Sequence, residues 1–82
     1  MNTFYYVYIL QSDKDPTKHY TGFTENIQKR LKKHNSGGCP HTAKFRPWFI
    51  QNYFAFHSKE KAIAFEKYLK SGSGREFARR HF

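Results

Sequence analysis

The sequence predicts an α+β domain: a small three-stranded antiparallel sheet flanked by helices, in the order β-β-α-β-α-α. Three observations lead to this fold class. An aromatic segment with two apolar faces opens the chain, a basic amphipathic segment follows it, and a second aromatic run precedes two further helical segments. With 82 residues and 20% aromatic side chains, the chain suits one domain, residues 1–82, with a core of bulky side chains.

The first two strands are expected to form a hairpin. Residues 4–10 alternate between two sets of side chains, and both sets are apolar or aromatic. A strand with two such faces belongs at the centre of a sheet, covered on both sides. Residues 11–18 are rich in Asp, Ser and Pro, which favour a turn, and residues 19–23, HYTGF, supply a short antiparallel return strand.

A helix and a third strand are expected next. Thr24 can cap a helix whose Ile27 and Leu31 face inward, and the sequence NSGG ends that helix. Residues 35–47 are expected to form an irregular basic loop. Residues 48–56, WFIQNYFAF, have the aromatic content of a strand.

Two more helices complete the predicted fold. Ser58 is a candidate N-cap for a helix that ends near Lys70, before the sequence SGSG. Ser73 and Glu76 have the spacing of a capping box, which predicts a short helix over Gly74–Arg80.

The charge distribution favours a polyanionic partner. The net charge is +9, and the excess lies in residues 25–82, which hold thirteen Lys and Arg against four Glu. Basic side chains that reach phosphates release condensed counterions, so nucleic acid is the expected partner. A solvated basic surface that serves solubility or ribosome association is the alternative.

The cysteine count and the length of the apolar runs indicate the cellular location that we expect for the protein. Cys39 is the one cysteine, which excludes an internal disulfide. The longest apolar run, residues 4–10, is far shorter than the roughly 20 residues that span a bilayer. We expect a soluble, cytoplasmic protein that has no membrane partner.

Three residues on the predicted helices have positions that amphipathic packing alone does not explain. Arg30 and His34 are four residues apart and so share one helix face, where a guanidinium can bind phosphate and an imidazole can move a proton. Glu66 falls inside the apolar stripe with Ala62 and Leu69. A carboxylate there needs an ion-pair partner or a bound cation, and the spacing leaves both open. Candidate partners are Arg30, Arg46 and Arg75.

The tyrosines of the hairpin need hydrogen-bond partners if they are buried. They could satisfy one another, which would be a purely structural arrangement. Tyr6 and Tyr8 share a face, and the return strand can bring Tyr20 beside them. Phenols that accept the proton of water, a glutamate that binds Mg²⁺ and an arginine that stabilises the phosphate charge are together suited to the hydrolysis of a phosphodiester. The sequence CPH at residues 39–41 lacks the further ligands of a zinc site.

Four short motifs in this order resemble those of the GIY-YIG nuclease family. They are YVY at 6–8, YTG at 20–22, RLKKH at 30–34, and Glu66 within AFEKYLKSG. The resemblance extends from about Phe4 to about Lys70, and the chain is similar to small stand-alone members that resemble the N-terminal domain of excinuclease C. The family's fold is a three-stranded antiparallel sheet flanked by helices. The chain departs from the motifs at Phe23, where some members carry a lysine.

The resemblance implies a catalytic site formed by Tyr8, Tyr20, Arg30, His34 and Glu66. Glu66 would hold Mg²⁺ or Mn²⁺, Arg30 would stabilise the charge of the phosphate, and Tyr20 or His34 would help to deprotonate water. The implied activity is that of a metal-dependent endonuclease that cuts DNA, including structured or damaged DNA. The candidate nucleic-acid contacts are Lys29, Lys33, Lys44, Arg46, Lys70 and Arg75.

A non-catalytic nucleic-acid-binding module with the same fold is the alternative function, and a structural adaptor without affinity for nucleic acid is a third. Phe23 is the departure that keeps both open. A chain of 82 residues leaves little room for a specificity domain. We therefore expect weak sequence preference, or targeting by a protein partner or a homodimer.

Overall fold

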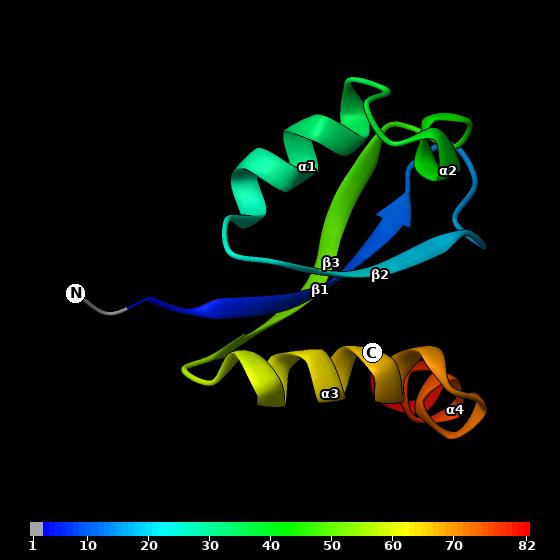
Figure 1. The fold of residues 1–82 in the computed structure, drawn as a ribbon. Helices are drawn as coiled ribbons and strands as arrows, with labels where there is room; N and C mark the ends of the chain where they lie inside the picture. Colours follow the sequence, from blue (N-terminus) through cyan, green and yellow to red (C-terminus); the bar gives the residue numbers. More distant parts are fainter. Residues whose placement is uncertain (1–2) are drawn as a thin grey trace.

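Three strands and four helices make up the structure, a computed structural model that describes residues 3–82. Their bounds are β1 Tyr5–Ser12, β2 His19–Thr24, α1 Ile27–Asn35, α2 Pro40–Ala43, β3 Trp48–Phe56, α3 Lys59–Lys70 and α4 Gly72–His81. The strands form one antiparallel sheet in the order β2-β1-β3. Helices α1 and α2 lie on one side of the sheet, and α3 and α4 lie on the other (Figure 1). The predicted α+β class and three-stranded antiparallel sheet are confirmed.

Strand β1 is central, as its two apolar faces predict. Val7 and Ile9 pack with Ala62 and Leu69 on the α3 side of the sheet. The alternate side chains, Tyr8 and Leu10, pack with Trp48 on the α1 side. The fold therefore has two small cores, one on each face of the sheet, and Tyr8 belongs to the one beneath α1.

The start of α1 differs from the prediction, because Asn26 caps this helix and Thr24 does not. The Asn26 side chain accepts a hydrogen bond from the Lys29 amide at 3.0 Å. Thr24 is the last residue of β2, where it pairs with Tyr6, and its hydroxyl accepts from the Asn26 amide at 3.1 Å. The strand pairing of Thr24 delays the helix by two residues.

The predicted irregular loop over residues 35–47 contains the one-turn helix α2. Pro40 stands at its first position, where a missing amide proton costs nothing. The indole Nε1 of Trp48 donates to the Thr42 carbonyl at 2.8 Å. The Asn35 side chain joins the Trp48 backbone through bonds of 2.6 and 3.0 Å. A helix of four residues shows no periodicity in the sequence, and these contacts hold it in place.

The connection between α3 and α4 also differs from the prediction. Helix α3 follows Ser58, whose side chain accepts from the Lys61 amide, as expected. Helix α4 begins at Gly72 with Ser71 as its N-cap, so Ser73 and Glu76 form no capping box. The Ser71 hydroxyl accepts from the Gly74 amide at 3.1 Å.

Phe23, the departure from the family's motifs, has a packing role. Its ring stacks on Tyr5 with centroids 6.3 Å apart, and it lies against the core on the α3 side. Over residues 3–82, every helix is too short or too polar to pass through a bilayer.

Candidate nuclease site at the β2 edge

A buried tyrosine and a buried histidine lie at the centre of the candidate site. The Tyr8 hydroxyl on β1 is 2.9 Å from Nε2 of His34 on α1. Tyr8 is 1% exposed and His34 is 0% exposed. The structure thus brings together two of the predicted site residues, and both lie beneath the surface.

Gly22 leaves the space that the Tyr8 ring fills. The two residues are paired across β1 and β2. A Cβ atom at Gly22 would collide with the Tyr8 hydroxyl and would lie 2.9 Å from Cε2 of Tyr20. The glycine of the second motif therefore permits a close approach between backbone and ring.

Burial sets the protonation states of the central pair. Burial raises the pKa of Tyr8 well above its ordinary value, Tyr20 raises it further, and the Arg30 guanidinium offsets part of the increase. Burial also lowers the pKa of His34, and the charges of Arg30 and Lys33 lower it further. At neutral pH the pair is therefore a phenol and an uncharged imidazole.

The low pKa of His34 predicts that the fold loses stability in mild acid. The unfolded chain takes up a proton at the ordinary histidine pKa of about 6.5, whereas the buried imidazole resists protonation. The free energy of unfolding should therefore decrease as the pH falls below about 6.5, with a slope of at most about 1.4 kcal/mol per pH unit, the limit for one proton. Urea unfolding at about pH 7.5, 6.5 and 5.5 measures this slope.

His41 provides the control for this prediction, because it is exposed on α2. His41→Asn should keep the pH dependence of the wild type, and His34→Asn should lose it. A slope that survives His34→Asn would contradict the assignment.

Tyr20 connects the buried pair to the surface. Its ring centroid is 4.9 Å from that of His34 and 6.2 Å from that of Tyr8. Tyr20 is only partly buried. On its other side, Nζ of Lys70 lies 5.8 Å from the ring centroid. Of the clustered aromatic side chains, Tyr20 is the one that a substrate at the edge of β2 can contact.

Arg30 lies on α1, one turn before His34, as the spacing predicts. It is partly buried, and its charge acts on the pKa of both Tyr8 and His34. It also lines a groove along α1 together with Lys29 and Lys33. The guanidinium therefore lies between the buried pair and a basic surface, where it can bind a phosphate.

Glu66 has an ion-pair partner, and that partner is Lys70. Its Oε2 lies 3.2 Å from Nζ of Lys70, and the two side chains are 19% and 48% exposed. The candidate partners Arg30, Arg46 and Arg75 are therefore wrong. The i,i+4 spacing of a glutamate before a lysine was the sequence signal for this pair. Because Lys70 also lies over Tyr20, it connects Glu66 on α3 to the edge of β2.

A second groove, here called the β2–α4 groove, has Tyr20 among its lining residues. It runs between the β1–β2 hairpin and the α3–α4 pair, and no Asp or Glu occurs among its lining residues within the described part of the chain. Its cationic and histidine side chains are Lys18, His19, Lys70, Arg75 and Arg79. Of these residues, the sequence prediction names Lys70 and Arg75 as nucleic-acid contacts.

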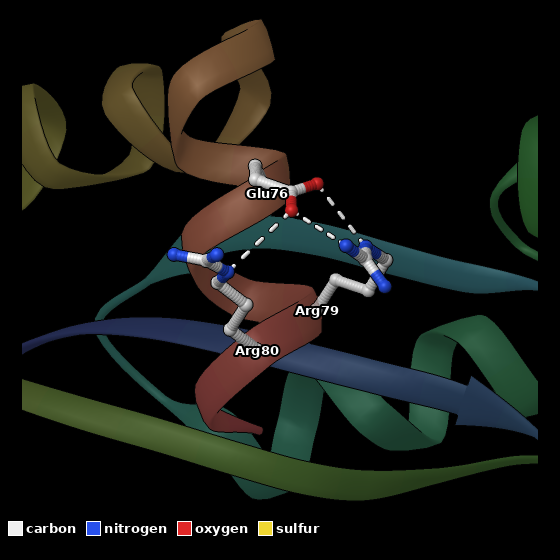
Figure 2. A network of polar contacts seen from close by, with 3 residues as sticks. All are labelled: Glu76, Arg79 and Arg80. Atoms are coloured by element: carbon white, nitrogen blue, oxygen red, sulfur yellow. Dashed lines mark hydrogen bonds and ion pairs between the residues drawn. The ribbon is translucent and has the colours of Figure 1, made fainter.

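Arg79 of this groove is held by an acidic neighbour on its own helix. Figure 2 shows Glu76 accepting from Nε and Nη2 of Arg79, at 3.1 and 2.5 Å, and contacting Nε of Arg80 at 3.6 Å. The hydrogen bonds from Arg79 lower the pKa of Glu76. Within residues 3–82, Glu76 makes its ion pairs with these two arginines and not with Arg75.

Lys44 and Arg46 lie in the segment between α2 and β3. Nζ of Lys44 is 5.6 Å from the centroid of the Phe45 ring. The Arg46 guanidinium fills the space beside Gly37, which has a φ of 84° after the end of α1. The predicted nucleic-acid contacts are thus spread over three surfaces: the α1 groove, the β2–α4 groove and this segment.

Thr42 is a polar residue of the site that sequence reasoning missed. It is 1% exposed, and its Oγ1 lies 2.8 Å from Nδ1 of His34. The sequence contains no signal for this contact, because α2 is too short to show a pattern.

The fold is that of a known domain family. The family model described as the GIY-YIG catalytic domain matches residues 4–80. The chain belongs to the GIY-YIG family, as the four motifs predict.

The relatives are of two kinds. The chain is 41% identical over 73 residues to UPF0213 protein BH0048 of Halalkalibacterium halodurans, covering 88% of this chain and 76% of that protein. The solution NMR structure of the UPF0213 protein BH0048 from Bacillus halodurans matches with a TM-score of 0.56 and 38% identity, over 93% of this chain and 80% of that one.

The relatives of the second kind are larger proteins than this chain. Structure-specific endonuclease subunit SLX1 of Debaryomyces hansenii is 43% identical over 74 residues, which is 82% of this chain. The match covers 21% of that protein. The chain therefore corresponds to about a fifth of the SLX1 relative.

Proposed function

We propose that the protein is an endonuclease that uses a divalent metal ion, Mg²⁺ or Mn²⁺, to hydrolyse phosphodiester bonds in DNA. The observation that carries the proposal is the convergence on one sheet edge of Tyr8, Tyr20 and His34, with Arg30 on one side and the Glu66–Lys70 pair on the other. These are the residues that the family's motifs single out. The family membership and the SLX1 relative support the nuclease class.

Each residue of the proposed site has a role that fits its position. Tyr20, which has exposed surface, orients and helps to deprotonate the attacking water. Arg30 binds the phosphate and stabilises the charge that develops on it. Tyr8 and His34 are buried and hold this arrangement from beneath. Of the two candidate bases, the geometry therefore favours Tyr20 over His34.

Glu66 suits Mg²⁺ as a protein ligand. Mg²⁺ keeps several waters and is commonly bound through one or two carboxylates together with substrate phosphates. Among residues 3–82, no three His, Cys, Asp or Glu side chains gather at one point, so Glu66 would act as a single carboxylate ligand. When bound, the ion would polarise the phosphate and neutralise its charge. Lys70 has a long side chain that is 48% exposed, so it can leave the carboxylate.

Cleavage assays with Glu66→Gln test the proposal. The wild type should cut supercoiled, branched or single-stranded DNA in Mg²⁺ or Mn²⁺ and should stop when the metal is chelated. Glu66→Gln should lower the rate by roughly 10²–10³-fold, the usual loss when one group that stabilises the transition state is removed. Glu60→Gln, an exposed change in the first turn of α3, is the matched control and should cut normally.

A non-catalytic nucleic-acid-binding module is the second candidate. The Glu66–Lys70 ion pair favours it, because this pair neutralises the carboxylate without any metal. The two functions differ in their outcomes. A salt-dependent mobility shift that needs no metal, with no cleavage of any of the substrates, would support the binding module and overturn the endonuclease.

Targeting and location complete the proposal. We propose that a protein partner or a second copy of the chain directs the enzyme, and the SLX1 relative, which is named as a subunit, supports this. Binding of DNA would use the α1 groove, which Arg30 lines, and the β2–α4 groove, which Tyr20 and Lys70 line. A cytoplasmic location is proposed from the single cysteine, Cys39.

A further inference from the structure

The buried hydrogen bonds of Tyr8, His34 and Thr42 leave few choices for where their protons lie. Oγ1 of Thr42 is 2.8 Å from Nδ1 of His34 and 3.2 Å from the carbonyl oxygen of Cys39. The Tyr8 hydroxyl is 2.9 Å from Nε2 of His34. A neutral imidazole carries one proton and each hydroxyl carries one, so three protons serve three contacts.

One arrangement gives every proton an acceptor. Thr42 donates its proton to the Cys39 carbonyl, as hydroxyls within a helical turn often do. His34 then donates from Nδ1 to Oγ1 of Thr42, and Tyr8 donates to the lone pair on Nε2. All three contacts are hydrogen bonds in this arrangement.

The opposite arrangement leaves one buried hydroxyl proton without an acceptor. If Thr42 donated to Nδ1, the imidazole proton would be on Nε2 and would point to the Tyr8 oxygen. The Tyr8 proton would then need another acceptor, and none is present among its contacts in residues 3–82. Arg30 cannot accept it, because a guanidinium is only a donor. An unpaired buried hydroxyl costs about 1–3 kcal/mol, which decides against this arrangement.

Thr42 is itself fixed by contacts outside its own helix. Its carbonyl accepts from Nε1 of Trp48 at 2.8 Å, and Trp48 is tied to α1 through Asn35. These hydrogen bonds tie α2 and Trp48 to α1. The Thr42 hydroxyl therefore keeps a constant position relative to His34.

We propose that Thr42 is a positioning residue: it fixes His34 as the tautomer protonated on Nδ1, so that Nε2 accepts the Tyr8 proton and sets the orientation of the Tyr8 hydroxyl beside Tyr20. The tautomer follows from the hydrogen bonds alone. Its importance for cleavage rests on the proposed endonuclease function.

The charged and titratable groups near His34 agree with this arrangement. They are Arg30 and Lys33 on α1, Tyr8 on β1 and Tyr20 on β2. The two cations disfavour a second proton on the imidazole, and no carboxylate appears among the groups that shift its pKa. His34 therefore keeps a free lone pair for Tyr8 at neutral pH.

Nitrogen NMR of the histidine ring in the intact protein tests the tautomer without any need for cleavage. In the wild type, Nδ1 of His34 should show the signal of a protonated nitrogen and Nε2 that of an unprotonated one. Thr42→Ser keeps the hydroxyl and should keep this pattern. Thr42→Val removes the acceptor at nearly constant volume and should shift the proton toward Nε2. A wild-type proton on Nε2, or a pattern unchanged by Thr42→Val, would overturn the proposal.

Cleavage kinetics test the positioning role. Thr42→Val should lower kcat by roughly 10–100-fold, the usual loss for a group that orients another functional side chain, with little change in KM. Thr42→Ser should restore kcat. Thr3→Val, a change at an exposed threonine before β1, is the control and should have no effect.

The NMR and cleavage measurements together distinguish failure of the positioning role of Thr42 from failure of the proposed nuclease function. The expected tautomer shift together with an unchanged kcat would overturn the positioning role and leave the nuclease intact. A wild type that cuts no DNA would overturn the proposed function, while the NMR result would still decide the tautomer. If Thr42→Val fails to fold, the wild-type spectrum alone remains decisive.

Discussion

Gly74→Ala should destabilise the fold by about 3 kcal/mol, the upper end of the usual cost of adding a methyl group to a packed site. A Cβ atom at this buried position would fall on the backbone carbonyl of Tyr68 and lie 2.7 Å from Cα of Leu69. Backbone atoms cannot move aside as the end of a flexible side chain can. The α3–α4 turn would have to open, which would separate α4 from Leu69 and the rest of the core on the α3 side.

Urea unfolding of Gly74→Ala measures this loss, and the midpoint should fall without a change in m. The thermal midpoint should fall by more than about 10 °C. Gly72→Ala is the matched control, because a Cβ there meets nothing within 4 Å. That variant should be neutral or slightly stabilising, by up to about 1 kcal/mol. Equal losses in the two variants would mean that the close contact at Gly74 is not the cause.

Gly22→Ala should disturb the site more than the fold. The new methyl group would collide with the Tyr8 hydroxyl and press on Tyr20. Because Tyr8 is buried, its ring can move only by breaking its bond to His34. We expect a loss of about 1–3 kcal/mol in stability. We also expect a loss of roughly 10²-fold in cleavage, since a displacement of about 1 Å in a site has that effect.

A double-mutant cycle with Tyr8→Phe shows whether the collision is responsible. Removing the hydroxyl relieves part of the clash, and the Tyr8–His34 bond has already been weakened by Gly22→Ala. The two changes should therefore cost less together than the sum of their separate costs, by at least about 0.5 kcal/mol. Additive losses would contradict this account. Thr21→Ala, the next position on β2, is the control for general weakening of the strand.

The elements of the fold could be predicted because each depends on neighbours in sequence. The alternation in residues 4–10 is enough to indicate a central strand, and the aromatic run 48–56 gives β3 with its observed bounds. The N-cap residues of α1 and α4 were harder to predict. Thr24 and Ser73 have good local patterns, but Asn26 and Ser71 cap the helices. Strand pairing by Thr24 and the close approach at Gly74 decide these positions, and neither is local.

The candidate site could be predicted in part. The motifs indicate Tyr8, Tyr20, Arg30, His34 and Glu66 as candidates, and the structure brings the first, second and fourth of these into contact. The depth of burial could not be predicted, because α1 and β1 cover these side chains only after the sheet has formed. The partner of Glu66 was missed although its spacing was visible in the sequence.

The sequence by itself determined the family, the three strands, the helices α1, α3 and α4, and the basic excess, because motifs, periodicity and charge are written in consecutive residues. The tertiary structure alone decided which polar groups are buried together. The Tyr8 hydroxyl contacts His34, which is 26 positions away in the sequence. His34 also contacts Thr42, which lies on a helix of four residues. A buried polar group must find a hydrogen-bond partner wherever the fold supplies one, and that partner is set by packing in space.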